Sequence, residues 1–248
     1  MVFIDIHCHL DFCNDVPSII KRAISHEVRI IITHGVNPKS NRSSLEFSGK
    51  YSEVKSALGL YPIDALKLSD SDIEKELTFI EENKDNIFAI GEVGMDFKED
   101  LKEHERQQKI FEKLIALSIR INKPIIVHSR KAEKECIDLL EKLEAKKVIM
   151  HCFCGKWELV EGIVRNNWFI SLPANVKSSQ QFQRIARDIP IERLFCETDS
   201  PYLHPDKLPN NEPSFVIESY RKIAELKNLS LSDVEKAVSY NFEALLKA

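Results

Sequence analysis

The sequence lacks any apolar run long enough to cross a membrane, and it lacks a block of charge of one sign. Asp5, His7 and His9 interrupt the apolar stretch near the N-terminus, so we expect no signal peptide. The 35 basic and 39 acidic residues are spread along the chain and give a net charge of −4. A nucleic-acid partner could therefore not depend on a broad basic face, and any attraction for phosphate would have to be local.

The sequence also lacks the cysteine patterns that predict disulfides. Its six cysteines form no Cys-x-x-Cys motif and no disulfide-rich spacing. In a chain for which no signal peptide is expected, reduced thiols are the ordinary state. We therefore expect a cytoplasmic protein with no membrane partner, and no protein partner is evident from the sequence.

What the chain does contain is a regular alternation of apolar runs and helical patterns. The apolar, β-branched runs predict strands at residues 3–9, 28–35, 54–60, 87–92, 124–128, 148–151, 168–172 and 194–197. Helical patterns follow them at residues 16–26, from 38 onward, and at 71–83, 104–121, 133–143, 158–165, 180–187, 213–226 and 232–246.

This alternation predicts the α/β class and a single (β/α)8 TIM barrel, with an open doubly wound sheet as the alternative. No Gly/Ser/Pro-rich linker divides the chain, so we expect one domain over residues 1–248. The barrel is favoured because the candidate site residues lie at the C-terminal ends of strands one, four, five, six and eight. Those ends converge on one mouth only if the sheet closes.

Two histidines at the end of the first predicted strand form the first part of a candidate metal site. His7 and His9 are spaced i, i+2, so both side chains leave the same face of a strand. Taken alone they could be a chance pair, but later apolar runs also end in His, Glu or Asp. In a closed barrel the candidate ligands would face one cavity: His7, His9, Glu92, His128, His151 and Asp199.

Six ligands exceed the three protein groups and one water of a typical catalytic zinc. They suit two divalent ions about 3.5–4 Å apart, with Glu92 as the bridging carboxylate because its strand lies between those of the histidines. Two such ions would activate a water, and their charge would attract an anionic ester such as a phosphodiester. Four imidazoles favour zinc on intrinsic affinity.

Three residues near the mouth of the predicted barrel have further candidate roles. Asp199 would ligate one ion and orient the nucleophilic water or take its proton, with a turn-capping Asp before Ser200-Pro201 as the alternative. Arg130 could bind a phosphate or be a solvated loop residue. Glu197 faces the same way as Asp199 one layer deeper, and we expect it to hold a ligand in place.

Six short motifs follow one another along the chain: Asp5-Ile6-His7-Cys8-His9, Ile90-Gly91-Glu92-Val93-Gly94-Met95-Asp96-Phe97, Val127-His128-Ser129-Arg130, His151-Cys152-Phe153-Cys154-Gly155, Glu197-Thr198-Asp199-Ser200-Pro201 and Asn211-Glu212-Pro213. In kind and order they resemble the TatD family of metal-dependent deoxyribonucleases, which belongs to the amidohydrolase superfamily of TIM barrels. The resemblance implies a phosphodiesterase that trims DNA, often as a 3′ exonuclease, with a role in DNA repair or degradation. It implies the same six ligands, two divalent ions that are Mg2+ or Mn2+ for activity, and a DNA substrate that is single-stranded or has a free 3′ end. Because of the four imidazoles, we expect that Zn2+ could be bound in place of these ions.

Two departures from the family pattern concern the substrate. Gly59-Leu60-Tyr61-Pro62 stands where the family usually has Gly-x-His-Pro. Tyr61 can donate a hydrogen bond to phosphate or stack on a base, but it cannot be a cationic imidazolium. The basic residue that often precedes Asn-Glu-Pro is also missing.

Two other functions stay open on the sequence. One keeps the metal site but hydrolyses a small amide, lactone or ester, as elsewhere in the superfamily. The other is a non-enzymatic module that binds DNA ends or a protein and keeps the metals for structure.

The remaining histidines and the central cysteine pair receive ordinary roles. We expect His26 and His204 to be exposed, and His34 to line the mouth or to be structural. Cys152 and Cys154 are expected to be buried small residues and not thiolate ligands.

Overall fold

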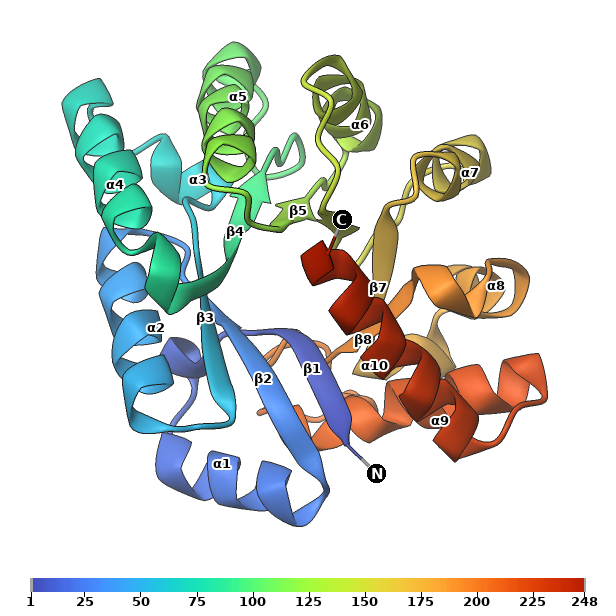
Figure 1. The fold of residues 1–248 in the computed structure, drawn as a ribbon. Coiled ribbons are helices and arrows are strands. Elements are labelled where there is room, and N and C mark those ends of the chain that lie inside the picture. Colours follow the sequence, from blue (N-terminus) through green and yellow to red (C-terminus); the bar gives the residue numbers. More distant parts are fainter. Residues whose placement is uncertain (1, 248) are drawn as a thin grey trace.

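The computed structural model describes residues 2–247 and forms a barrel of parallel strands with helices on its outside (Figure 1). The strands follow sequence order around the barrel: β1 (Phe3–Cys8), β2 (Val28–His34), β3 (Val54–Leu58), β4 (Ile87–Gly94), β5 (Ile125–His128), β6 (Val148–Met150), β7 (Phe169–Pro173) and β8 (Leu194–Glu197). The predicted (β/α)8 TIM barrel is confirmed, since β8 also lies against β1.

Helices connect the strands and surround them: α1 (Val16–Ser25), α2 (Pro38–Lys50), α3 (Pro62–Ala65), α4 (Asp70–Glu82), α5 (His104–Arg120), α6 (Glu133–Lys142), α7 (Trp157–Arg165), α8 (Gln180–Asp188), α9 (Ile217–Lys227) and α10 (Leu231–Lys247). The sequence does not predict α3, because four residues are too few to show a helical period. None of the helices in residues 2–247 is long and apolar enough to span a membrane.

Hydrogen bonds between β1 and the end of β8 close the barrel. Cys8 pairs with Ser200, the N–H of His9 donates to the carbonyl of Ser200 (2.8 Å), and the N–H of Asp199 donates to the carbonyl of His7 (2.9 Å). These bonds join segments about 190 residues apart in the sequence. They bring the candidate ligands of the first and last strands side by side.

A buried side-chain pair strengthens this seam. Thr198 donates its backbone N–H to Oδ1 of Asp5 (2.8 Å) and its hydroxyl to Oδ2 (2.6 Å). Both residues are fully buried. Because buried polar groups are costly when unpaired, each partner depends on the other.

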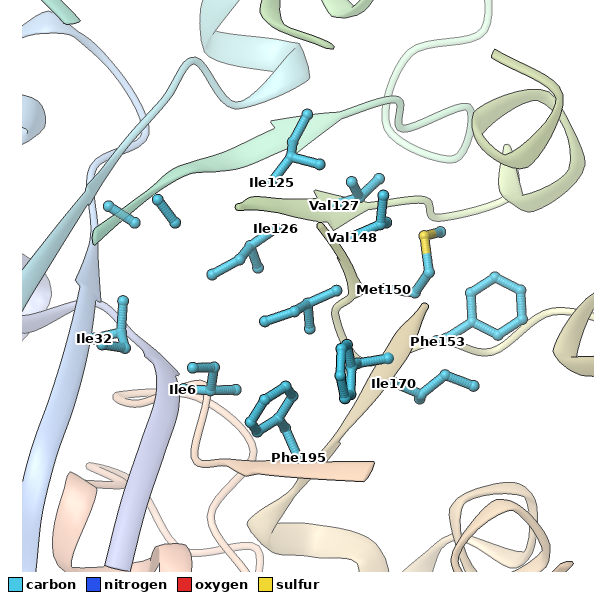
Figure 2. Close-up of a cluster of buried hydrophobic side chains, with 14 of the residues drawn as sticks. Ile6, Ile32, Ile125, Ile126, Val127, Val148, Met150, Phe153, Ile170 and Phe195 are labelled. Carbon is cyan, nitrogen blue, oxygen red and sulfur yellow. The ribbon is translucent and has the colours of Figure 1, made fainter. Parts of the chain in front are cut away.

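The barrel interior is apolar below the mouth. Figure 2 shows Ile6, Ile32, Ile126 and Phe195 gathered between the strands, and all four are fully buried. Side chains two residues apart on a strand share a face. His128 therefore lies one layer nearer the mouth than Ile126 on β5. Glu197 likewise lies one layer nearer the mouth than Phe195 on β8.

The opposite end of the barrel is covered by α10, and this leaves the C-terminal ends of the strands as the open end. Asn241 on this helix donates to the carbonyls of Ile191 and Leu194, at the start of β8. The ring of Phe242 stacks on Phe88 near the start of β4, with centroids 5.0 Å apart.

One glycine allows β4 and β5 to approach closely beside the candidate site. Gly94 has φ of 139°, and a Cβ at this position would lie 1.9 Å from the carbonyl oxygen of His128. No other residue type fits here without moving that carbonyl. β4 thus runs two residues beyond its predicted end, and Glu92 lies inside the strand.

We predict that Asp5→Ala destabilises the protein by about 2–4 kcal/mol, because it leaves the N–H and hydroxyl of Thr198 buried without their partner. Urea unfolding followed by circular dichroism measures the change. Asp138→Ala is the control, since this exposed residue forms a surface ion pair on α6 and should change stability by less than about 0.5 kcal/mol. Equal effects of the two substitutions would contradict the role given to the seam.

Candidate metal centre

Four ligand atoms from the first, fourth and last strands face one point at the mouth of the barrel. The Nε2 atoms of His7 and His9 lie 3.2 Å apart. Glu92 Oε2 lies 3.5 Å from the first of these atoms and 3.3 Å from the second. Asp199 Oδ1 lies 3.6 Å from both.

These separations fit a bound cation. Ligand atoms about 2.1 Å from one ion in tetrahedral geometry would lie roughly 3.4 Å from one another. The orientation of His9 also fits, because its Nδ1–H donates to the carbonyl of His34 (3.2 Å) and leaves Nε2 to face the cluster. The set of two imidazoles and two carboxylates is one that divalent metal ions bind.

Glu92 joins this cluster to a second group of residues. While Oε2 faces His7 and His9, Oε1 lies 3.0 Å from Nδ1 of His128. The carboxylate thus spans both groups, as a bridging ligand would. The bridging role of Glu92 stays a prediction.

His151 follows the end of β6 and packs against His7 of the first group. Its ring stacks on that of His7 with centroids 3.7 Å apart, and its Nε2 lies 3.9 Å from Asp199 Oδ1. Its Nδ1–H donates to Oε2 of Glu197 (2.9 Å). Glu197 therefore lies one layer below the mouth and fixes the ring of a candidate ligand, in the position that the sequence predicts.

The backbone places Asp199 at the exit from β8. Its φ of 55° lies in the left-handed region, which Asp tolerates better than most residues. Its side chain keeps 15% of its surface exposed, whereas that of His7 is fully buried. Asp199 can therefore contact both a bound cation and water in the cavity above.

Buried carboxylates raise the pKa of two histidines in the centre. Burial alone would lower the pKa of His9, but the carboxylates of Asp199 and Glu92 raise it to about 10. Burial is likewise outweighed at His151, where Glu197 raises the pKa to about 9. The carboxylates therefore favour positive charge here, either as protons on the imidazoles or as divalent cations that displace them.

Asp96 is a site residue that the sequence reasoning missed. Its Oδ2 accepts from Nε2 of His128 (2.9 Å), and its Oδ1 accepts from the backbone N–H groups of Lys98 and Glu99 (both 2.9 Å). Although burial would raise the pKa of Asp96, these hydrogen bonds lower it to about 2. The carboxylate therefore holds His128 in one orientation. Its place in the motif of the fourth strand is the signal that could have revealed it.

The centre forms the floor of a cavity of about 850 Å³. Tyr61 and Arg130, the predicted substrate-binding residues, both line this cavity. Each already has a protein partner: the Tyr61 hydroxyl donates to Asp96 (3.0 Å), and Arg130 Nη1 donates to Glu99 (3.2 Å). A substrate phosphate would therefore have to compete with these partners.

His34 supports the centre from below. It is fully buried, its ring stacks on that of His7 with centroids 3.9 Å apart, and its Nε2 donates to the carbonyl of Ile6 (3.2 Å). Burial and the nearby charge of His9 lower its pKa to about 3. Of its two expected roles, the structure favours the structural one.

The structure contradicts the exposure predicted for His204 and the burial predicted for Cys154. His26 is exposed as expected, but His204 is only 7% exposed, because its ring packs against Phe215 at 4.6 Å. Cys154 is exposed at the cavity, whereas we expected it to be buried, and Cys152 is partly buried beside it. Both errors fall in loops, where burial depends on contacts with other segments.

Comparison with known proteins agrees with these features. The family model for TatD related DNase matches residues 4–247 of the chain. The chain belongs to this family. The motif resemblance found in the sequence is thereby confirmed, and the protein is a metal-dependent hydrolase of the TatD family.

Relatives of this TatD-family chain occur in distant organisms. The uncharacterized metal-dependent hydrolase MJ1582 of Methanocaldococcus jannaschii is 34% identical over 242 residues, covering 96% of this chain and 94% of its own length. Deoxyribonuclease TATDN3 of Homo sapiens is 32% identical over 252 residues, covering 96% of this chain and 92% of its own length. The crystal structure of YJJV, a TatD homolog from Escherichia coli, superposes with a TM-score of 0.92 at 25% identity, covering 99% and 98% of the two chains.

We predict that Glu197→Gln lowers the affinity for Mn2+ about 10–100-fold, because the neutral amide holds His151 less firmly than the carboxylate. Calorimetric titration of metal-stripped protein with Mn2+ measures this affinity. Glu192→Gln, an exposed residue just before β8, is the matched control and should bind Mn2+ like the wild type. An unchanged affinity in Glu197→Gln would show that the contact with His151 does not serve metal binding.

Proposed function

We propose that this protein hydrolyses phosphodiester bonds in DNA as a 3′–5′ exodeoxyribonuclease, with two divalent ions bound in the candidate centre. The position of Glu92 carries the proposal, because one carboxylate oxygen faces His7 and His9 and the other faces His128. A carboxylate shared in this way suits two cations better than one. The family match and the deoxyribonuclease name of the human relative support DNA as the substrate.

Mg2+ or Mn2+ are the ions proposed for turnover, and the imidazoles would also bind Zn2+. When bound, two divalent ions would supply a more acidic water and stabilise the negative charge that develops on the phosphodiester. Six residues would hold them, with Glu92 shared: His7, His9 and Asp199 on one side, and His128 and His151 on the other.

The protein itself positions the reacting groups. Asp199, which is accessible from the cavity, would orient the attacking water and accept its proton. Glu197 and Asp96 keep the rings of His151 and His128 in fixed orientations. The centre therefore needs little rearrangement before reaction, which lowers the entropic cost of the step.

The charges of the cavity wall make DNA binding depend on metal. Before histidines and metal ions are counted, the lining carries five carboxylates and three cations: Asp64, Glu92, Glu99, Glu133 and Asp199 against Lys98, Arg130 and Lys131. A phosphate would enter this excess of negative charge only when divalent ions occupy the centre. The buried floor of the cavity suits a single-stranded 3′ end better than a continuous duplex.

Hydrolysis of a small amide, lactone or ester is the second candidate. The observation that favours it is the pairing of Arg130 with Glu99, which makes that part of the rim neutral. An uncharged substrate would not have to break this pair, whereas a phosphate would.

We predict that Asp199→Asn and Glu92→Ala each slow DNA hydrolysis by roughly a factor of 10³ or more, because they remove a proton acceptor and a shared ligand. Metal-stripped protein is incubated with a 5′-labelled single-stranded oligonucleotide, and Mg2+, Mn2+ or Zn2+ is added separately. The wild type should give a metal-dependent ladder that shortens from the 3′ end.

The control for this assay is Asp188→Asn, an exposed acidic residue at the end of α8, which should cleave like the wild type. Wild-type rates in Asp199→Asn would refute the role of this carboxylate. An intact oligonucleotide with every metal would refute the nuclease proposal and favour a screen of esters, lactones and amides.

Arg130→Ala tests whether this residue leaves Glu99 to contact the substrate phosphate. If DNA is the substrate, we expect the Michaelis constant for the oligonucleotide to rise about tenfold, because a charge-assisted contact to phosphate is lost. Steady-state kinetics measures it, with Arg187→Ala on α8 as the exposed control. An unchanged Michaelis constant would mean that Arg130 stays paired with Glu99 during turnover.

A further inference from the structure

Two exposed aromatic rings stand on one wall of the cavity. Phe12 ends the 3-10 turn that follows β1 and is 43% exposed, while Tyr202, in the loop after β8, is 54% exposed. Within residues 2–247 one other aromatic ring is comparably exposed, that of Tyr240 on α10, outside the cavity. Single exposed rings are ordinary, but two that gather at a candidate active site indicate a binding surface.

Both rings contact the same candidate ligand. Phe12 stacks on the imidazole of His9, with centroids 5.5 Å apart and planes 28° apart, and Tyr202 meets this imidazole edge-on at 6.4 Å. Since His9 Nε2 faces the candidate cation site, the rings lie beside the place where a reacting phosphate would be held. A nucleotide separates its base from its phosphate by one sugar, so a base could reach these rings while its phosphate lies on the floor.

The opposite wall has a different chemistry. Lys98 in the loop after β4, and Arg130 and Lys131 after β5, line the cavity on that side. Proteins that bind single-stranded DNA combine aromatic rings for the bases with cations for the backbone. The cavity thus offers one wall for each part of a nucleotide, with the candidate metal centre between them.

We propose that Phe12 and Tyr202 form a base-stacking subsite for the 3′-terminal nucleotide of single-stranded DNA. The inference rests on the proposed function and adds how the substrate end is held. Stacking uses the π-face that every base has, so the subsite accepts all four bases. A base that is paired at the end of a duplex must leave its partner first, so duplex ends bind less well.

The test uses Mn2+-loaded protein and a single-stranded oligonucleotide that carries 2-aminopurine at its 3′ end, with a terminal phosphorothioate to slow hydrolysis. Stacking on an aromatic ring quenches the fluorescence of this base. We expect quenching with the wild type and with Tyr202→Phe, which keeps the ring. Phe12→Leu and Tyr202→Leu should each lose most of the quenching and bind roughly tenfold more weakly.

Three comparisons complete the test. Tyr240→Leu should behave like the wild type, and calorimetric Mn2+ affinity and thermal unfolding should be unchanged in the leucine variants. An oligonucleotide with an abasic 3′ end should bind the wild type about as weakly as the leucine variants. Wild-type quenching and affinity in both leucine variants, or no binding by the wild type, would overturn the subsite.

Cleavage of the ordinary oligonucleotide, measured in parallel, separates this proposal from the proposed function. Quenching without cleavage would support the subsite and refute the nuclease activity. Cleavage without quenching would support the nuclease activity and refute the subsite.

Discussion

The closure of β1 against β8 is the constraint on which the rest of the structure depends. His7 and His9 come from the first strand and Asp199 from the end of the last, so these residues meet only because the ends of the sheet join. The hydrogen bonds between Asp5 and Thr198 lie directly below this junction and are excluded from water. Stability of the fold and geometry of the site therefore share the same contacts.

Above this seam, buried carboxylates hold the histidine rings of the site in place. Glu92 lies among three imidazoles, and their hydrogen bonds hold its pKa well below the usual range even though burial would raise it. Glu197 and Asp96 each take one ring nitrogen of a histidine, so the other nitrogen has a defined direction. An arrangement of this kind is costly without a cation and favourable with one, which links metal binding to the order of the site.

The chemistry of the cavity changes from one wall to the other. Near β1 and β8 it presents the rings of Phe12 and Tyr202. Near β4 and β5 it presents Lys98, Lys131 and Arg130, of which Arg130 is paired with Glu99. Such a division suits a ligand that is itself divided into an aromatic and an anionic part. If the proposed function holds, a chain of net charge −4 would still bind a nucleic acid, because the phosphate would meet only the local surface at the candidate metal centre.

The sequence by itself determined the order of strands and helices, because that order depends on local periodicity. It also determined the six candidate ligands at the C-terminal ends of the strands, because these depend on position along a strand. It also indicated that Glu197 faces into the barrel below Asp199, since a spacing of two residues defines one face of a strand. Tertiary structure alone decided that Arg130 is paired with Glu99, that Asp96 holds His128, and that Phe12 and Tyr202 stand together. It likewise decided that His204 is buried and Cys154 exposed. The physical reason is the same in each case: loop side chains take their burial and partners from segments far away in the sequence, and no local pattern records those contacts.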